Sequence, residues 1–416
     1  MSKKIATPKY RFIDFKDDLQ WSISLLKDFS IPIKKRAGAN KYTTLSITSG
    51  TGLVSQAEKF GREIAGSSYK NYLVIQRGDF AYNKSATKIF PEGYIAMLSE
   101  YDEGAVPNSI FTCFRITDEN VCVNFIKHLF QSNYHGAWLR RFITVGARAH
   151  GSLNIDDKNL WDLPVALPKY SEQQKIADCL TSLDELIAAE NKKLEALKTH
   201  KKGLMQKTFP VEGQSVPEVR FNGYTGAWEL RNVGEYVRDY VERTTEQNQH
   251  PVLTSSQQQG IVFQEDYFSN RQITTTNNIG YFVLPRGYFT YRSRSDNGMF
   301  RFNRNDLIDR GIISYFYPVF SIINGDSDFF LQLLNSQIYK QAALAAEGTG
   351  QKVLSLKKFK NIKIVVPNFQ EQSAIGAFFR NLDEVISAQA EKIEDLKQHK
   401  KGLMQGLFPS AQEVME

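Results

Sequence analysis

The stretch PKYSEQQKIADCLTSLDELIAAENKKLEALKTHKKGLMQ, residues 168–206, returns at residues 367–405 as PNFQEQSAIGAFFRNLDEVISAQAEKIEDLKQHKKGLMQ. The offset is 199 residues without a gap, and the last seven residues of the two copies are identical. Weaker similarity precedes each copy at an offset near 209, where PKYRF (8–12) resembles PEVRF (217–221) and GDFAY (78–82) resembles GYFTY (287–291). Since an internal repeat decides the architecture, we expect a tandem duplication.

Each copy of the repeat is expected to be a long helix. Apolar residues recur at steps of four and three, the heptad spacing of a coiled coil. A proline precedes each copy, and a Phe-Pro pair follows it. The predicted seam comprises Ile176, Leu183, Ile187, Glu190, Leu194 and Leu197 in the first copy, and Phe379, Leu382, Ile386, Gln389, Ile393 and Leu396 in the second.

The two helices are expected to run antiparallel, related by a pseudo-twofold axis. Full overlap of the seams opposes Leu183 to Ile393 and leaves Lys201 and Lys400 at the ends, where their ammonium groups reach water. Glu190 and Gln389 are the polar residues at mid-seam. Either they fix the register, or they mark a loosely packed point open to solvent.

The segments around the helices are aromatic and β-branched stretches bounded by Gly, Pro and Asn, which predict strands. The expected fold class is α+β, with two mixed, mostly β domains separated by two long antiparallel coiled-coil helices. The expected boundaries are 1–167 (first domain), 168–210 (first helix), 211–366 (second domain), 367–409 (second helix) and 410–416 (C-terminal tail).

Composition narrows the class of protein. The net charge is +7, and residues 1–170 carry 23 basic and 16 acidic side chains, which is compatible with binding a polyanion. The three cysteines form no C-x-x-C pair, which argues against a disulfide framework or a zinc site and favours the reducing cytoplasm. No apolar run is long enough for a bilayer, so we expect no membrane association.

Catalytic motifs are missing from the sequence. There is no glycine-rich cofactor loop, no Asn/Asp-Pro-Pro-aromatic methyltransferase site and no G-x-x-x-x-G-K-[ST] phosphate loop. The six histidines show no ligand spacing, so no metal site is expected. We therefore expect no catalytic residues and no cofactor in this chain.

Loops rich in guanidinium, ammonium and amide groups are candidates for contacting DNA, because Arg and Lys pair with guanine and Asn and Gln with adenine. A solvated loop is the alternative for any one of them, and a phosphate contact is favoured for Lys34 to Arg36. Tyr82 and Tyr291 occupy equivalent positions, so a shared packing role competes with a DNA role. The candidates are Lys34, Lys35, Arg36, Asn83, Lys84, Ser85 and Arg148 in the first domain, and Ser256, Gln257, Gln258, Arg292, Ser293, Arg294 and Lys352 in the second.

With these motifs in view, the chain resembles the specificity subunit of type I restriction–modification systems. The resemblance rests on the Glu-Gln pairs at 172–173 and 371–372, which lead into helices ending in KKGLMQ, on the linker VPEVRFNGYTGAWE (216–229), and on the loop GTGQK (348–352). It covers essentially the whole chain. The first domain departs from it in the loop VGARAHG (145–151).

The resemblance implies that each β domain is a target recognition domain for one half of a bipartite, asymmetric site in double-stranded DNA. It implies that the helices act as a spacer and dock two modification subunits, which methylate adenine using S-adenosylmethionine. Restriction subunits that use ATP and Mg²⁺ are optional further partners. The spacer, about 42 Å long, would set the half-site centres on the order of 12 base pairs apart.

Two other classes remain open at this stage. A coiled-coil scaffold that binds only protein would lack basic, amide-rich loops in both domains. A self-contained DNA methyltransferase or nuclease is disfavoured by the missing motifs.

Overall fold

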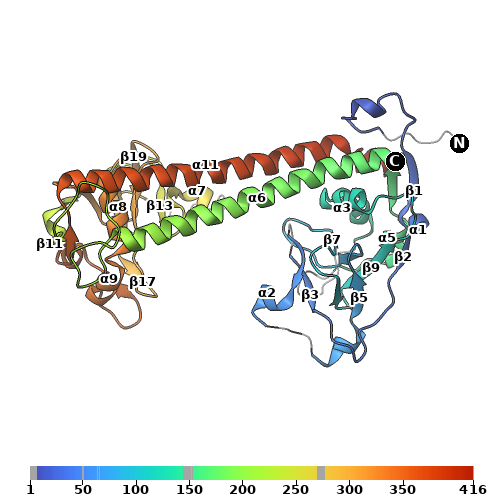
Figure 1. Cartoon of the computed structure of the whole chain (residues 1–416), viewed down its shortest axis with the longest axis horizontal. Helices are drawn as coiled ribbons and strands as arrows, with labels where there is room; N and C mark the ends of the chain where they lie inside the picture. Colours follow the sequence, from blue (N-terminus) through green and yellow to red (C-terminus); the bar gives the residue numbers. More distant parts are fainter. Residues whose placement is uncertain are drawn as a thin grey trace. The chain divides into compact units, whose positions relative to one another are not determined.

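The computed structural model describes residues 7–48, 51–62, 64, 66–143, 151, 153–268 and 277–415. The chain forms two compact units: unit 1 contains residues 1–190 and 392–416, and unit 2 contains residues 191–391. Each unit therefore holds one β domain and one piece of each long helix (Figure 1). The two units repeat the same core sheet, which confirms the duplication.

Unit 1 is built on a four-stranded antiparallel sheet of strand order β2-β9-β6-β7. Phe80 lies opposite Met97 on one side and Phe114 on the other. The rings of Phe80 and Phe114 stack with their centroids 5.2 Å apart. Aromatic side chains suit the half-buried face of a pleated sheet, which explains why these segments form strands. The bounds are Ser30–Pro32 (β2), Phe80–Asn83 (β6), Tyr94–Met97 (β7) and Phe111–Ile116 (β9).

Three further strand pairs and several short helices complete unit 1. The helix α3 buries Phe125 and Leu129 in the same core as the sheet. The strand pairs are β1 (Ser22–Leu25) with β10 (Pro164–Leu167), β3 (Leu45–Thr48) with β4 (Gly52–Ser55), and β5 (Leu73–Gln76) with β8 (Glu103–Val106). The helices are η1 (Ile13–Phe15), α1 (Leu26–Phe29), α2 (Gln56–Phe60), η2 (Ser67–Asn71), α3 (Val123–Gln131), α4 (Tyr134–Leu139), η3 (Arg140–Phe142) and α5 (Asp157–Trp161).

Unit 2 repeats this plan around the sheet β12-β20-β16-β18. Phe289 stacks on Phe320 at 5.6 Å, as Phe80 stacks on Phe114 in unit 1. The sheet strands are Val237–Tyr240 (β12), Phe289–Tyr291 (β16), Phe302–Arg304 (β18) and Val319–Ile322 (β20). The pairs are β11 (Glu229–Asn232) with β22 (Lys363–Val366), β13 (Leu253–Ser256) with β14 (Gly260–Phe263), β15 (Phe282–Pro285) with β19 (Arg310–Ile313), and β17 (Arg294–Ser295) with β21 (Lys352–Val353). The helices are η4 (Val233–Glu235), α7 (Gln264–Tyr267), α8 (Ser327–Ser336), α9 (Tyr339–Ala345) and α10 (Leu356–Lys360).

The two expected long helices are α6 (Tyr170–Thr208) and α11 (Phe369–Leu407), each of 39 residues, and a short helix α12 (Ala411–Met415) follows. All twelve predicted seam residues are buried or half-buried. Leu194 and Ile393 are 8% and 3% exposed. The heptad pattern thus locates the face of each helix that packs.

Ion pairs within the units show that the helices are antiparallel. In unit 1, Lys400 bonds to Asp184 and Lys392 bonds to Glu190, so the numbers rise on one helix as they fall on the other. In unit 2, the Lys201 ammonium lies 2.7 Å from Oδ2 of Asp383, and the ring of Phe209, just after α6, packs 6.1 Å from that of Phe379 on α11. The antiparallel arrangement is therefore present in each unit.

The register differs from the predicted one. Full overlap of the seams would place Lys392, rather than Lys400, opposite Asp184, so the observed pairs lie about two helical turns further along α11. The expectation that Lys201 and Lys400 reach water is also wrong, because both ammonium groups are held by aspartates and the side chains are 18% and 13% exposed. A paired ammonium inside the seam avoids the cost of burying an unpaired charge.

A buried ion pair ties the start of each long helix to the segment that precedes its domain. Arg11 donates two hydrogen bonds of 2.7 Å to Glu172. Arg220 donates two of 2.7 and 2.6 Å to Glu371. The glutamate side chains are 1% and 0% exposed. We name each pair the Arg–Glu clamp.

The neighbouring glutamines complete the attachment. The side-chain oxygen of Gln173 accepts the N–H of Cys122 before α3 at 2.8 Å, and that of Gln372 accepts the N–H of Asp326 before α8 at 3.1 Å. These N–H groups precede helices and have no partner inside them. The repeated Glu-Gln pair is therefore a structural device that fixes each helix to its domain.

Candidate nucleic-acid interface

A cavity of about 540 Å³ in unit 2 brings two of the predicted loops together. Its walls are the turn between β13 and β14, the segment that follows β16, and the stretch from β17 to β18. The predicted DNA-contacting residues that line it are Ser256, Gln257, Gln258, Arg292 and Arg294. We name this cavity the arginine–amide pocket.

The β13–β14 turn carries two exposed side-chain amides, and hydrogen bonds fix its backbone. The Ser256 hydroxyl accepts the N–H groups of Gln258 and Gln259 at 3.2 Å each. Asn303, buried on β18, donates to the Ser256 carbonyl oxygen at 2.7 Å. Ser256 is itself buried and shapes the turn, whereas the side chains of Gln257 and Gln258 are exposed. The two glutamines therefore present exposed side-chain amides at the pocket.

The arginines of the pocket are presented by the end of the core sheet. Tyr291, the last residue of β16, is fully buried, and Arg292 directly after it is exposed. The guanidinium of Arg294 lies 4.3 Å from the ring centroid of Phe316, a cation–π contact that holds it in place. Ser293, between them, donates its hydroxyl to the carbonyl oxygen of Phe316 at 2.7 Å, which gives it a structural role.

The remaining candidate of this domain, Lys352, lies beside the pocket. It is half-buried on β21, where its backbone pairs with Ser295 of β17. Its neighbour Gln351 donates to Asp296 of the pocket wall at 2.9 Å. The GTGQK loop therefore supports the wall that carries Arg294.

Asn297 and Arg301 are among the polar residues of the pocket that sequence reasoning missed. Asn297 accepts hydrogen bonds from the Ser295 hydroxyl and the Met299 N–H, and so shapes the loop after β17. Arg301 directly precedes β18. No spacing in the sequence singles this arginine out.

The candidates of the first domain are not gathered in this way within the described residues. Lys34, Lys35 and Arg36 are exposed after β2, and Arg36 lies opposite Leu73 in an isolated bridge. Asn83 to Ser85, at the end of β6, are half-buried, and the Lys84 ammonium forms an ion pair of 2.7 Å with Asp157. Arg148 lies outside the described residues.

The equivalent tyrosines of the two domains have a packing role. The Tyr82 hydroxyl donates to the carbonyl oxygen of Glu92 at 2.8 Å, and the Tyr291 hydroxyl donates to that of Leu354 at 3.0 Å. Burial raises the pKa of both phenols. Both side chains are therefore enclosed, hydrogen-bonded core residues.

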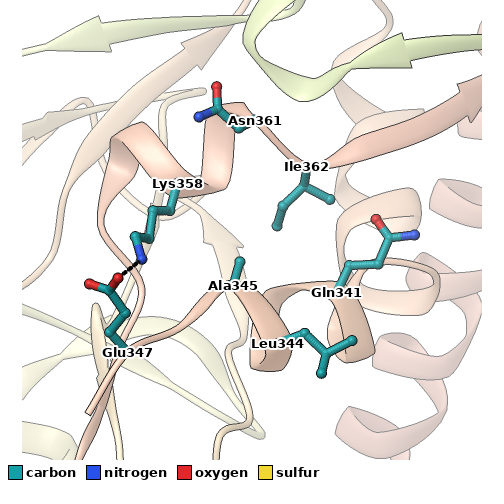
Figure 2. Close-up of a pocket in the computed structure, with 7 residues that line it drawn as sticks. All are labelled: Gln341, Leu344, Ala345, Glu347, Lys358, Asn361 and Ile362. Atoms are coloured by element: carbon teal, nitrogen blue, oxygen red, sulfur yellow. Dashed lines mark ion pairs between the residues drawn. The ribbon is translucent and has the colours of Figure 1, made fainter.

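A second hollow of unit 2, of about 600 Å³, lies between α9 and α10 (Figure 2). Its Lys358 ammonium is neutralised by an ion pair with Glu347, and the side chain of Leu344 is 84% exposed. None of the residues predicted to contact DNA lines it. Its chemistry does not favour an anionic ligand.

Within the described part of the chain, no group of three or more His, Cys, Asp or Glu side chains is suited to a metal ion. Among the same residues, no helix has the length and apolar character needed to cross a bilayer.

Comparison with known proteins connects this geometry to a family. The model of the type I restriction modification DNA specificity domain matches residues 67–199 and again residues 220–398. The type I restriction enzyme MjaVIII specificity subunit of Methanocaldococcus jannaschii is 24% identical over 295 residues, covering 63% of this chain and 65% of the relative. The putative type I restriction enzyme MjaX specificity subunit of the same organism is 23% identical over 292 residues, covering 67% and 64%. The chain thus spans slightly less than two thirds of the length of these curated relatives.

Solved structures share the fold. The S subunit of a type I restriction–modification system from M. genitalium superposes with a TM-score of 0.54 at 14% identity, covering 97% of this chain and 99% of that one. A chain from a structure of a type I R-M system gives 0.53 at 18% identity, covering 94% and 98%. The fold therefore extends over nearly the full length of both chains.

Proposed function

Because this chain belongs to the family of the type I restriction modification DNA specificity domain, we propose that it is the subunit that selects the DNA sequence for a type I restriction–modification complex. Each β domain reads one half of a bipartite, asymmetric site. The observation that carries the proposal is the arginine–amide pocket, which gathers exposed amides and guanidinium groups at one end of a recognition sheet.

The chemistry of the pocket suits base edges. Arg292 and Arg294 offer the forked donors that pair with O6 and N7 of guanine, and Gln257 and Gln258 offer the amide that pairs with N6 and N7 of adenine. Asn303 holds the backbone of the β13–β14 turn, and Phe316 holds the guanidinium of Arg294, so this part of the pocket is in place before DNA binds. Preorganised donors lose less entropy when they bind.

The proposal assigns the chemistry to partner proteins. Two modification subunits dock on the helices and methylate adenine with S-adenosylmethionine, and restriction subunits, where present, supply ATP- and Mg²⁺-dependent cleavage. The chain itself contributes no cofactor, and the complex acts on DNA in the cytoplasm. The names of the relatives, which are specificity subunits, support this division of labour.

Reconstitution tests the proposal. The chain combined with a modification subunit should place methyl groups on adenines in two half-sites separated by a fixed number of unread base pairs, as read by methylome sequencing. Neither protein alone should methylate DNA. Methyl transfer by the purified chain alone, or a contiguous target site, would contradict the proposal.

A protein-only scaffold is the competing function. It predicts no affinity for duplex DNA, with or without the modification subunit. A titration of the reconstituted complex with duplex DNA separates the two functions.

A further inference from the structure

A groove of unit 2, separate from the hollow between α9 and α10, adjoins the arginine–amide pocket. It has a volume of about 690 Å³ and lies between the last turns of α6 and the segment that joins α8 to α9. The residues that matter for its chemistry are Lys198, Lys202, Phe209, Glu212, Arg301 and Lys340. We name it the lysine groove.

The base of the groove is rigid and apolar. Phe209 is 3% exposed, and its ring centroid lies 5.6 Å from that of Phe329 and 6.1 Å from that of Phe379. The side-chain amide of Gln337 donates to the carbonyl oxygen of Pro210, which holds the chain beyond α6 against α8. The groove is therefore formed by packed elements.

The rim of the groove is positively charged. Lys202, Lys340 and Arg301 form no ion pair within the part of the chain that the structure describes. Lys198 pairs with Glu195 at 2.9 Å, but both side chains are at least half exposed, so this pair is weak. Of the described residues that line the groove, Glu212 is the only carboxylate that could oppose these charges. The fifth basic residue, Lys201, is neutralised by Asp383.

The groove continues the candidate DNA-reading surface, because Arg301 lines both the groove and the arginine–amide pocket. If the bases of a duplex contact Arg292 and Arg294, its phosphate backbone must extend beyond the pocket on both sides. We propose, on the basis of the proposed function, that the lysine groove binds the phosphate backbone of that duplex outside the base pairs that unit 2 reads. Lys198, Lys202, Lys340 and Arg301 supply the donors.

The charges of Arg301 and Lys340 distinguish unit 2 from unit 1. The repeat places Lys397 and Lys401 where α6 has Lys198 and Lys202. The strand registers, however, put Tyr94 at the position of Arg301. Gly136 in α4 stands where α9 has Lys340, at the same offset of 204 residues that matches His128 with Gln332. Both Tyr94 and Gly136 are buried. The backbone contact is therefore a property of the second domain.

Salt dependence of DNA binding tests the inference. The double variant Lys198→Ala with Lys202→Ala should reduce the slope of log affinity against log salt by about two units, since each lost phosphate contact removes about 0.9. Its affinity should fall alike for all sequences, and discrimination between bases should not change. The measurement uses a mixed-sequence duplex of about 30 base pairs, from about 50 to about 300 mM salt, with the chain alone and with its modification subunit.

A matched control removes two charges from the other side of the same helix. Lys193 and Lys207 are exposed and lie roughly half a turn away from Lys198 and Lys202 around α6, at about 100° per residue. The variant Lys193→Ala with Lys207→Ala should keep the wild-type slope. Circular dichroism should show that both variants are folded, because all four lysines are exposed.

The outcomes separate this inference from the proposed function. If the wild-type complex binds no duplex at all, the proposed function falls. If the wild-type complex binds and both double variants have the same slope, the groove inference falls and the proposed function stands. Loss of modification-subunit binding in the Lys198/Lys202 variant with an unchanged slope would identify the groove as a protein contact and overturn the inference.

Discussion

At the scale of single residues, each long helix carries one buried glutamate whose charge is neutralised by one arginine. Glu172 and Glu371 are visible in the sequence as a repeated Glu-Gln pair, and Arg11 and Arg220 as parts of another repeat. The sequence did not predict that they meet, because the partners are 161 and 151 residues apart and no local pattern links them. Only the folded chain shows that two separate repeats form one structural feature.

The Arg–Glu clamp yields a stability prediction. Arg220→Ala leaves the Glu371 carboxylate buried without its counter-ion, and should lower the free energy of unfolding by roughly 3–5 kcal/mol. Lys207→Ala, which removes an exposed pair with Glu218, should cost less than about 1 kcal/mol. Denaturant titration measures both. A double change of Arg220→Met with Glu371→Met should restore most of the loss. Equal effects of Arg220→Ala and Lys207→Ala would show that the clamp adds little.

A second prediction concerns Arg294 in the arginine–amide pocket. A bidentate guanine contact requires the guanidinium, so Arg294→Lys should cost roughly 1–3 kcal/mol of binding and relax one position of the target site. A phosphate contact would tolerate the lysine. Arg286, exposed and paired with Asp309, provides the control, and Arg286→Ala should leave recognition unchanged. Methylome sequencing and duplex titration read the result, and an unchanged target with Arg294→Lys would place this arginine on phosphate.

At the scale of the elements, the heptad pattern predicted the seam but not the register. An antiparallel seam of apolar residues looks nearly the same after one helix slides by about one heptad. The apolar residues alone therefore could not choose between neighbouring registers. The pairing of Lys400 with Asp184, and of Lys201 with Asp383, distinguishes them, because a slide of two turns would separate each lysine from its aspartate.

Disulfide crosslinking checks this register. Cysteines replacing Asp184 and Lys400 should crosslink under mild oxidation, whereas cysteines replacing Leu183 and Ile393 should not. The natural Cys113, Cys122 and Cys179 are first changed to serine or alanine in both variants. Efficient crosslinking of the 183–393 pair would restore the register expected from the sequence.

The contact between α3 and α6 is expected to depend on pH. His128 is buried on α3, and its Nε2 lies 3.0 Å from the Thr181 hydroxyl on α6. Burial, together with the charge of Lys400, lowers the pKa of this imidazole to about 4. The ordinary pKa of histidine is about 6.5. Below that pH, His128 gains a proton in the unfolded chain but not in the folded chain. Stability is therefore full above about pH 6.5 and falls as the pH drops towards 4.

The variant His128→Gln tests this, because unit 2 has Gln332 at the matching position, where its amide donates to Asp383. The free energy of unfolding of the wild-type protein should fall as the pH drops from about 6.5 to 4.5. In the variant this fall should be smaller by about 1 kcal/mol per pH unit. His135, which is also buried and has its pKa lowered to about 4, remains in the variant and keeps part of the dependence. An unchanged pH profile would mean that His128 titrates alike in the folded and unfolded chain.

At the scale of the whole molecule, the sequence predicted the fold class and the duplication, because both depend on patterns repeated over many residues. It singled out the two loops that line the arginine–amide pocket, but it did not predict that they meet, since the β13–β14 turn and Arg292 come together only through the packing of the core sheet. Arg301 was missed because a single arginine before a strand has no distinctive spacing. In the first domain, Lys84 was a candidate from composition, and its pairing with Asp157 gives it a structural partner that composition cannot reveal.

Modularity is the prediction that belongs to this scale. Replacing residues 211–366 with the second domain of another family member should change one half of the target site and leave the other half intact. Methylome sequencing of cells that carry the chimaera and its modification subunit reads both halves. The reciprocal exchange of residues 1–167 is the control and should change the opposite half. A chimaera that alters both halves would show that the domains do not read independently.

The discontinuity of unit 1 has a consequence for the order in which the protein is made. Unit 2 is a continuous stretch, residues 191–391, so all of it has been synthesised while the last segment of unit 1 is still missing. That segment supplies Phe408, whose ring packs 5.3 Å from that of Phe125, and Val414, which is 4% exposed. Although its domain comes first in the sequence, unit 1 is the second to be completed on the ribosome. Until then, its apolar surface around Phe125 is open to chaperones and to aggregation.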